Sequence, residues 1–330
     1  MELEIWPSGF LLPSVDAECL QFLACVRICA APVKVVRATC PWGAPEGVYP
    51  VFKHGKTATC TGVNQLIAYL RTEVPNFPLD LHLKTAEKAE IAAYESLLKL
   101  KLHPAYLYSL WMDVANYNVF TSRWFGRQLP IGYGLYYAAK TRRAAVDYLR
   151  ALYPGKLTGE DNIEFAVTKQ ALLCINLLSS KLGDKKYFFG DKPSSLDALV
   201  FGYLAPLLKL PLPDDRLQMH IKACPNLVRF VDSMISIYMP LTDEEMTTQR
   251  ADLKEWEKRK ERAQLELQRT RRKQKEDKEQ SSSEDEFPLR HKIMFAVGAL
   301  FLSLLIAVHT GLIQVEVREV NREDVGGSED

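Results

Sequence analysis

The sequence has no surplus of charge of either sign. Its 42 lysines and arginines nearly balance its 41 aspartates and glutamates, so the overall charge does not favour nucleic acid or an acidic substrate as a partner. Apolar residues are not scarce, because 47% of the chain is hydrophobic and 10% is aromatic. This composition supplies a sizeable core and excludes a chain that is disordered throughout.

The spacings of a metal site are also missing. The seven cysteines form no C-x-x-C pair and have no zinc-like spacing with the six histidines. Cys25 and Cys29 lie four positions apart, as metal ligands on one helical face would, but cysteines of this kind are more often small buried apolar residues. We therefore expect no metal, no cofactor and no catalytic residue supplied by these side chains.

Targeting signals are absent from the opening segment, MELEIWPSGF. This segment begins with acidic residues and has neither a basic region before an apolar core nor an arginine-rich amphipathic pattern. The bulk of the chain is therefore expected to face the cytosol.

Strand-like and helix-like patterns alternate over positions 1–80. Their predicted order is β-α-β-β-β-α, which describes a small α/β layer. Ser14 precedes the first helix and is the expected N-cap. Strands are expected at 3–6, 32–38, 49–53 and 57–60, and helices at 15–29 and 63–73.

Beyond this layer the pattern is wholly helical. Pro104 is expected to kink or split the first of these helices, because proline lacks a backbone N–H and clashes with the preceding turn. Ser194 and Asp197, three positions apart ahead of an apolar run, predict a capping box at the start of a buried helix. Helices are expected at 85–108, 135–152, 163–182, 195–209 and 227–238.

The capping box has a recognisable setting. It follows the aromatic-Gly-Asp sequence Phe189-Gly190-Asp191 and precedes the phrase CPNLVRF at 224–230. This arrangement resembles the C-terminal half of the glutathione transferase fold. The resemblance implies a fold of class α/β plus all-α, with an N-terminal thioredoxin-like layer and a C-terminal helical bundle.

A glutathione transferase needs a hydroxyl or thiol after the first strand to stabilise the thiolate of glutathione. Ser14 or Ser8 has the position for this role. The family also has a Gln/Glu-Ser pair that holds the γ-glutamyl end of glutathione, and aligning on Tyr69-Leu70 places Gly62 and Val63 there. Neither side chain binds a carboxylate or an ammonium, so the resemblance predicts a fold that has lost the side chains of the glutathione site. A site built from backbone groups alone, close to Thr61, is the alternative.

An apolar run without a formal charge, IMFAVGALFLSLLIAVHTGLIQV, occupies positions 293–315. As a helix the run would measure roughly 34 Å, against a hydrocarbon core of about 30 Å. It is predicted to be a transmembrane tail anchor. Apolar positions that define it are Ile293, Phe295, Leu300, Leu305, Val308 and Val315.

Charges flanking this run predict its orientation. Arg290, His291 and Lys292 stand just before it, while the segment EVREVNREDVGGSED after it is predominantly acidic. The basic flank places the N-terminal side in the cytosol. Physical reasoning alone leaves the endoplasmic reticulum and the mitochondrial outer membrane both open.

The stretch at 241–290 is dense in charge of both signs and is expected to be a partly helical or disordered linker. Pairs such as Glu255 and Arg259 favour a solvated helical stalk. A basic cluster in the stalk is a candidate for contact with anionic lipid, and three serines before acidic residues are candidate phosphorylation sites. The basic cluster comprises Arg269, Arg271, Arg272, Lys273 and Lys275, and the serines are Ser281, Ser282 and Ser283.

Over residues 1–240 and the apolar run near its end, the chain resembles the tail-anchored branch of the metaxin family. The residues that carry this are Trp6 with Leu12-Pro13-Ser14-Val15-Asp16, Trp111-Met112-Asp113 with Asn116-Tyr117, and Phe188-Phe189-Gly190-Asp191 completed at Asp197-Ala198. The expected divisions are a thioredoxin-like domain at 1–80, a helical domain at 81–240, the linker at 241–290, the anchor with its basic flank at 291–315, and an acidic intermembrane-space tail at 316–330.

This resemblance implies a non-enzymatic, single-pass subunit of the sorting and assembly machinery in the mitochondrial outer membrane, with most of the chain in the cytosol. Its implied partners are a second metaxin without an anchor and the barrel-forming core subunit, and its implied work is protein import and β-barrel insertion. Two alternatives remain at this stage. One is a membrane-tethered glutathione transferase, and the other is an organelle transport adaptor that uses the charged stalk.

Overall fold

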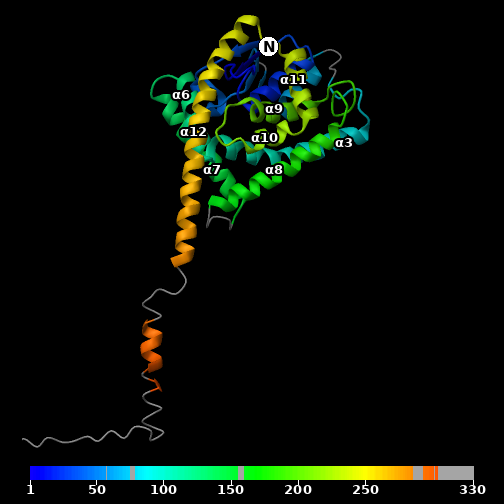
Figure 1. The fold of residues 1–330 in the computed structure, drawn as a ribbon. Coiled ribbons are helices and arrows are strands. Elements are labelled where there is room, and N and C mark those ends of the chain that lie inside the picture. Colours follow the sequence, from blue (N-terminus) through cyan, green and yellow to red (C-terminus); the bar gives the residue numbers. More distant parts are fainter. Residues whose placement is uncertain (57, 75–78, 155–159, 285–292, 301, 304–330) are drawn as a thin grey trace, which may run out of the picture. The chain divides into compact units, whose positions relative to one another are not determined.

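A computed structural model describes residues 1–56, 58–74, 79–154, 160–284, 293–300 and 302–303. The chain divides into two compact units, Met1–Glu266 and Leu267–Asp330. Figure 1 shows the N-terminal layer of the first unit in blue, with α7 and α8 on the other side of that unit.

The N-terminal layer is a four-stranded sheet with helices packed on it. Its strand order is β2-β1-β3-β4, with β1 parallel to β2 and the other neighbours antiparallel. The predicted order of elements is confirmed. In sequence order they are β1 (Glu2–Ile5), α1 (Ala17–Ile28), β2 (Lys34–Arg37), β3 (Val51–His54), β4 (Ala58–Cys60) and α2 (Val63–Glu73).

Helices make up the rest of the first unit. The expected break around Pro104 is confirmed: α3 stops at Leu97, a π-helical segment follows, and α4 starts one residue before the proline. The remaining helices up to α11 are α3 (Thr85–Leu97), α4 (His103–Leu107), α5 (Val114–Asn116), α6 (Ser122–Gln128), α7 (Tyr133–Leu152), α8 (Glu160–Leu182), α9 (Ser195–Lys209), α10 (Arg216–Lys222) and α11 (Pro225–Tyr238). The short helices α5, α6 and α10 were not predicted.

Two features join the sheet layer to the bundle. Trp6, which ends the first predicted strand, is buried and contacts the rings of Trp124, Phe125 and Tyr137 edge-on. Gly202 of α9 packs so closely on α1 that a Cβ there would lie 2.6 Å from the carbonyl oxygen of Ala17. The layers therefore share one core, and a side chain at position 202 would push α1 away.

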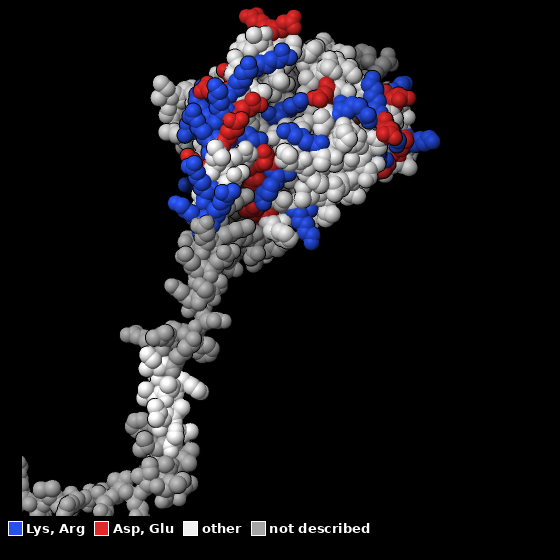
Figure 2. Space-filling view, viewed as in Figure 1, with Lys and Arg blue, Asp and Glu red and all other residues white. Residues whose placement is uncertain are grey.

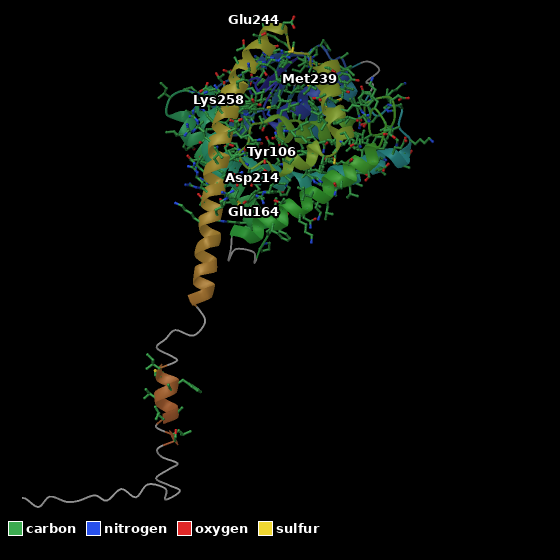
Figure 3. The ribbon with its side chains drawn as sticks, in the orientation of Figure 1. Tyr106, Glu164, Asp214, Met239, Glu244 and Lys258 are labelled. Atoms are coloured by element: carbon green, nitrogen blue, oxygen red, sulfur yellow. The ribbon has the colours of Figure 1, made fainter. Side chains whose placement is uncertain are left out.

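The charged stretch begins as a long helix, α12 (Asp243–Glu284), which starts near Glu244 and passes Lys258 (Figure 3). The expectation that this stretch is a solvated stalk is wrong for its first half. Trp256 is only 4% exposed and its ring packs on those of Phe10 and Phe120. The physical reason is a narrow buried stripe, which a few apolar residues can form within a very charged sequence.

Of the second unit, the structure describes the rest of α12 to Glu284 and the helical residues 293–300 and 302–303. Ile293, Phe295 and Leu300 belong to this helix and are exposed. No helix among the described residues is long and apolar enough to cross a membrane. Leu305, Val308 and Val315, with the flank Arg290, His291 and Lys292, lie outside the described residues.

Candidate functional site

A cavity of about 250 Å³ lies at the N-terminus of α2, beside Gly62 and Val63. α1, α2, α3 and α9 all contribute to its wall. Helix N-termini favour anions because their first N–H groups are free. Its lining is Glu18, Gln21, Phe22, Thr61, Gly62, Val63, Asn64, Gln65, Glu95, Leu98, Lys99, Leu199 and Tyr203.

The N-cap and the first residue of α2 offer no polar side chain for a peptide ligand. Gly62 is the N-cap and makes no side-chain cap, and Val63 follows it. Gln65 turns back so that its Oε1 accepts a hydrogen bond from the Thr61 N–H at 3.4 Å. The Gln65 side chain is therefore turned toward the residue that precedes the N-cap.

Polar side chains beside this helix end are engaged with one another. Glu95 accepts hydrogen bonds from Asn64 at 2.6 Å and from Lys99 at 2.7 Å. Burial raises the pKa of Glu95, but these two bonds outweigh it and hold the pKa below its ordinary value. The cavity thus contains an ionised carboxylate with its partners in place, on the wall formed by α2 and α3.

Ser14, the hydroxyl proposed both as a cap and as a thiolate partner, serves neither role in the structure. Its side chain is fully buried, and its Oγ has no hydrogen-bond partner among the described residues. The N-cap of α1 is Asp16, whose Oδ2 accepts from the Cys19 N–H at 3.1 Å. The prediction of Ser14 as the cap is wrong because α1 begins two residues later than the sequence pattern indicated. Ser8 is half-buried.

The loop between β1 and α1 is fastened by α12. Phe10 and Leu11 both have positive φ, 59° and 61°, in a tight turn closed by two hydrogen bonds between Gly9 and Leu12. The Leu11 N–H donates to Oε1 of Gln249 at 2.7 Å. This conformation is costly for non-glycine residues, so the contacts from α12 stabilise an arrangement that the loop alone would not favour.

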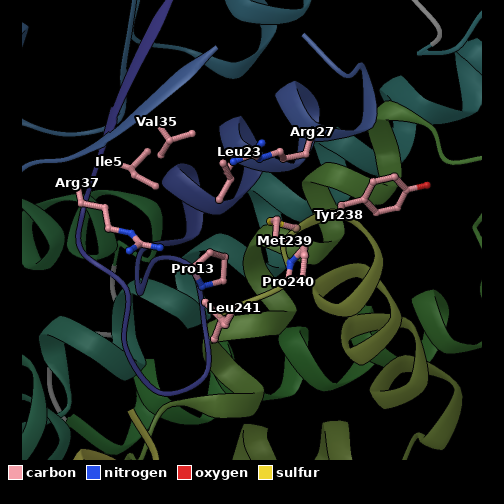
Figure 4. A pocket seen from close by; sticks show the side chains of 10 residues that line it. All are labelled: Ile5, Pro13, Leu23, Arg27, Val35, Arg37, Tyr238, Met239, Pro240 and Leu241. Atoms are coloured by element: carbon pink, nitrogen blue, oxygen red, sulfur yellow. The ribbon is translucent and has the colours of Figure 1, made fainter. Parts of the chain in front are cut away.

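A second cavity, of about 510 Å³, lies between the sheet, α1 and the segment that joins α11 to α12 (Figure 4). Its walls are mainly apolar. Arg27 and Arg37 bring positive charge to it, and Arg37 forms an ion pair with Glu245 of α12. The lining comprises Ile5, Pro13, Leu23, Arg27, Val35, Arg37, Tyr238, Met239, Pro240 and Leu241.

Ser194 and Asp197 lie at the start of α9 and line neither of these cavities. The Ser194 hydroxyl donates to Oδ2 of Asp197 at 2.6 Å, and the backbone N–H groups of Ser194 and Phe188 donate to the same carboxylate at 2.8 and 3.0 Å. Burial is the largest influence and raises the pKa of Asp197 to about 6, although all of these hydrogen bonds lower it. The group holds the start of α9.

The three serines predicted as phosphorylation sites lie in α12 and are not among the residues that line the two cavities. Ser281, Ser282 and Ser283 lie in the last turns of α12 and remain candidate phosphorylation sites. No group of three or more metal-binding side chains occurs within the described ranges.

The sequence reasoning missed one pattern in α12, the spacing of Gln249, Trp256 and Ala263. These three residues are all buried and recur at every seventh position, as the contact stripe of a packed helix does.

The sheet layer, the helical bundle and the groove at α2 define a protein with a glutathione-transferase-like fold. A glutathione S-transferase from Ceriporiopsis subvermispora, solved in complex with glutathione, matches with a TM-score of 0.52 over 73% of this chain and 98% of its own. Because the sequence identity is 16%, this likeness shows the fold alone. Residues 171–234 also match the family model described as Glutathione S-transferase, C-terminal domain.

Sequence comparisons identify the family. The chain is 43% identical to the metaxin-1 homolog of Caenorhabditis briggsae over 97% of its own length and 99% of that protein. Human metaxin-1 is 34% identical over 76% of this chain, which spans 53% of the human protein. Residues 19–142 match the family model described as Outer mitochondrial membrane transport complex protein. The chain belongs to the metaxin family, which supports a role in protein transport at the mitochondrial outer membrane.

Proposed function

We propose that this chain is a non-enzymatic subunit of the sorting and assembly machinery of the mitochondrial outer membrane. It would support protein import and the insertion of β-barrel proteins from the cytosolic face. The proposal that the chain is not an enzyme is carried by the cavity at the N-terminus of α2. There, Gly62 and Val63 occupy the positions of side chains that would hold a peptide ligand. The buried Ser14 hydroxyl supports the same conclusion, because it has no surface on which to meet a thiol.

Membrane attachment is proposed from the apolar run at 293–315. It would act as a single-pass tail anchor, with residues 1–290 in the cytosol and the acidic residues 316–330 in the intermembrane space. The absence of charge along the run and the basic flank before it support this topology. An anchor of this kind raises the effective concentration of the folded unit at the membrane, so that weak contacts become sufficient.

The proposed partners are a second metaxin that lacks an anchor and the barrel-forming core subunit of the same machinery. Family membership supports this assignment. Two folded units of this type beside a barrel could hold a precursor or brace the barrel without any chemical step. The mechanism is then binding and placement.

The test is co-purification from membranes. The full chain, tagged near its N-terminus, and a matched version without residues 293–315 are expressed, and mild-detergent extracts are compared. We expect the full chain in the mitochondrial outer membrane with a barrel subunit and a second metaxin, and we expect the shortened form to lose the membrane. Recovery in another membrane without such partners would contradict the proposal.

Two further measurements separate the alternatives. Retention on glutathione resin that is lost in Ser14→Ala would favour a tethered transferase instead. Deletion of 267–284 alone, which spares the packed half of α12, would alter organelle position without affecting precursor insertion if the chain were a transport adaptor.

A further inference from the structure

One stretch of the chain departs sharply from the overall charge balance. Residues 114–146 contain no aspartate or glutamate and five basic residues, and the next carboxylate is Asp147. None of the five forms a salt bridge within the part of the chain that the structure describes. On the face drawn in Figure 2, lysines and arginines lie near α6 and along α12, where aspartates and glutamates are interspersed among them. The five are Arg123, Arg127, Lys140, Arg142 and Arg143.

The same stretch exposes large apolar side chains. Ile131 stands at the tip of the turn between α6 and α7 and is fully exposed, and Leu135 in the first turns of α7 is 75% exposed. Gly132, with φ of 86°, allows the chain to turn sharply at this tip. Exposed apolar side chains that lie close together along the chain are candidates for an interaction site.

Aromatic and basic side chains share one side of α7. Tyr133, Tyr136, Lys140 and Arg143 are spaced by three and four residues, so they follow one another along the same face of the helix. Trp42, 73% exposed on the loop after β2, lies with its ring centroid 5.3 Å from that of Tyr133. The loop therefore extends the aromatic part of this face.

The loop after β2 brings one carboxylate, Glu46, close to this face. A Cβ built on Gly47 would lie 3.9 Å from Nζ of Lys140, which places the loop against the same side of α7. Glu46 lies on this loop but forms no salt bridge with Lys140 in the described structure. We call the surface formed by Trp42, Ile131, Leu135, Tyr136, Lys140 and Arg143 the aromatic-basic face.

We propose that the aromatic-basic face docks on a bilayer surface that contains anionic lipid. Its cations complement the lipid charge, tryptophan and tyrosine favour the headgroup region, and the projecting Ile131 and Leu135 suit insertion between headgroups. A bilayer fits better than an acidic protein because the apolar side chains protrude instead of lining a groove. This inference goes beyond the proposed function: it needs a membrane but neither precursor nor partner subunit.

Trp42 supplies the measurement. The other tryptophans, Trp6, Trp111, Trp124 and Trp256, are buried, so lipid-dependent changes in emission report on Trp42, and Trp42→Phe gives the background. The full chain is reconstituted with vesicles of brominated phosphatidylcholine, alone or mixed with phosphatidylserine. We expect a blue shift and quenching of Trp42 only with phosphatidylserine, and loss of both at high salt. Equal quenching in the two lipids would overturn the proposal.

Charge variants sharpen the result. Lys140→Gln with Arg143→Gln should lower the ratio of docked to undocked chains by about fivefold for each charge removed. Lys88→Gln with Lys185→Gln removes the same charge from positions elsewhere on the first unit and should leave quenching unchanged. Identical behaviour of the two double variants, or burial of Trp42 only when an acidic protein is added, would refute lipid docking.

Failure of the tail anchor gives a separate signature. A chain without a working anchor would not float with neutral vesicles, yet the aromatic-basic face would still draw it to vesicles that contain phosphatidylserine. The docking proposal and the anchor proposal can therefore fail independently of each other.

Discussion

Ser14 and Asp16 stand two residues apart at the start of α1 and have opposite energetic roles. Asp16 caps the helix through Cys19, and its other oxygen, Oδ1, accepts a hydrogen bond from the Tyr106 hydroxyl at 3.3 Å. Ser14 is buried with an unsatisfied hydroxyl. A buried hydroxyl without a hydrogen-bond partner destabilises the folded state, whereas a carboxylate that caps a helix stabilises it.

Substitution with alanine should therefore separate the two residues. Asp16→Ala is expected to lower the free energy of unfolding by about 1 kcal/mol through loss of the cap, while Ser14→Ala should leave it unchanged or raise it. Urea unfolding followed by circular dichroism measures both variants. A loss in Ser14→Ala as large as that in Asp16→Ala would mean that the Ser14 hydroxyl has a hydrogen-bond partner after all.

Asp197 predicts a pH dependence of stability. Its pKa in the folded protein, about 6, lies above the ordinary 3.8, so the folded state holds the proton more tightly than the unfolded chain does. Its stabilising contribution is therefore full below the ordinary pKa and is lost as the pH rises through about 6. The change corresponds to about 3 kcal/mol.

Comparison with Asp197→Asn isolates this contribution, because asparagine does not titrate. The free energy of unfolding of the native chain minus that of the variant should fall between pH about 4 and about 7. Chemical unfolding at several pH values gives this difference directly. A difference that rises over the same interval would show that the hydrogen bonds from Ser194 and Phe188 outweigh burial.

Among the elements, the first half of α12 is the least expected part of the core. The side chain of Gln249 accepts a hydrogen bond from the Leu11 N–H, and Trp256 packs against the rings of Phe10 and Phe120, which also contact each other. The guanidinium groups of Arg127 and Arg259 lie 5.3 and 5.1 Å from the centre of the Trp256 ring. Charged neighbours thus cover the tryptophan while their own charges remain near water.

Trp256→Ala is expected to lower the free energy of unfolding by about 3 to 5 kcal/mol, as for other buried large-to-small changes. Trp256→Phe keeps an aromatic ring against Phe10 and should lose much less. Lys254→Ala, an exposed position on the same helix, serves as the control. If Trp256→Ala unfolded at the same urea concentration as this control, Trp256 would not contribute to the core, and the packing of α12 described above would be contradicted.

At this scale the sequence predicted some elements well and missed others. Strand alternation, the Pro104 break and the apolar run after Ser194 each leave a strong local signal, so the order of elements and α9 could be anticipated. The packing of α12 could not be inferred from composition, because charge dominates its sequence. Its spacing by sevens at Gln249, Trp256 and Ala263 was the available signal. The cap of α1 was misplaced because serine and aspartate are both good cap residues.

Across the whole molecule, the compact first unit ends at Glu266, well past the expected boundary at 240. The polar contacts of α12 explain this extension. Lys260 pairs with Asp215 at 3.0 Å, and Gln264 donates to the carbonyl of Pro213 at 3.0 Å. The unit is thus a transferase-like fold with an added helix that reaches back to the turn after β1.

Two truncations test this boundary. A chain that stops after Glu266 should unfold in one cooperative transition at the same temperature as the first unit of the full chain. A chain that stops after Thr242 lacks Trp256 and should melt about 10 °C lower, given a loss of several kcal/mol. Calorimetry distinguishes them, and equal melting temperatures would place the boundary before α12.

The contact between Phe10 and Trp256 can form only late in translation, because its two residues are far apart in the sequence. A ribosome releases the chain from its N-terminus, so the turn at Phe10 and Leu11 emerges early and the helix that secures it emerges late. Until then the ring of Phe10 and the N–H of Leu11 lack their partners on α12. These two groups therefore stay without their α12 partners through most of translation. The helix that covers them is synthesised only shortly before the apolar run at 293–315.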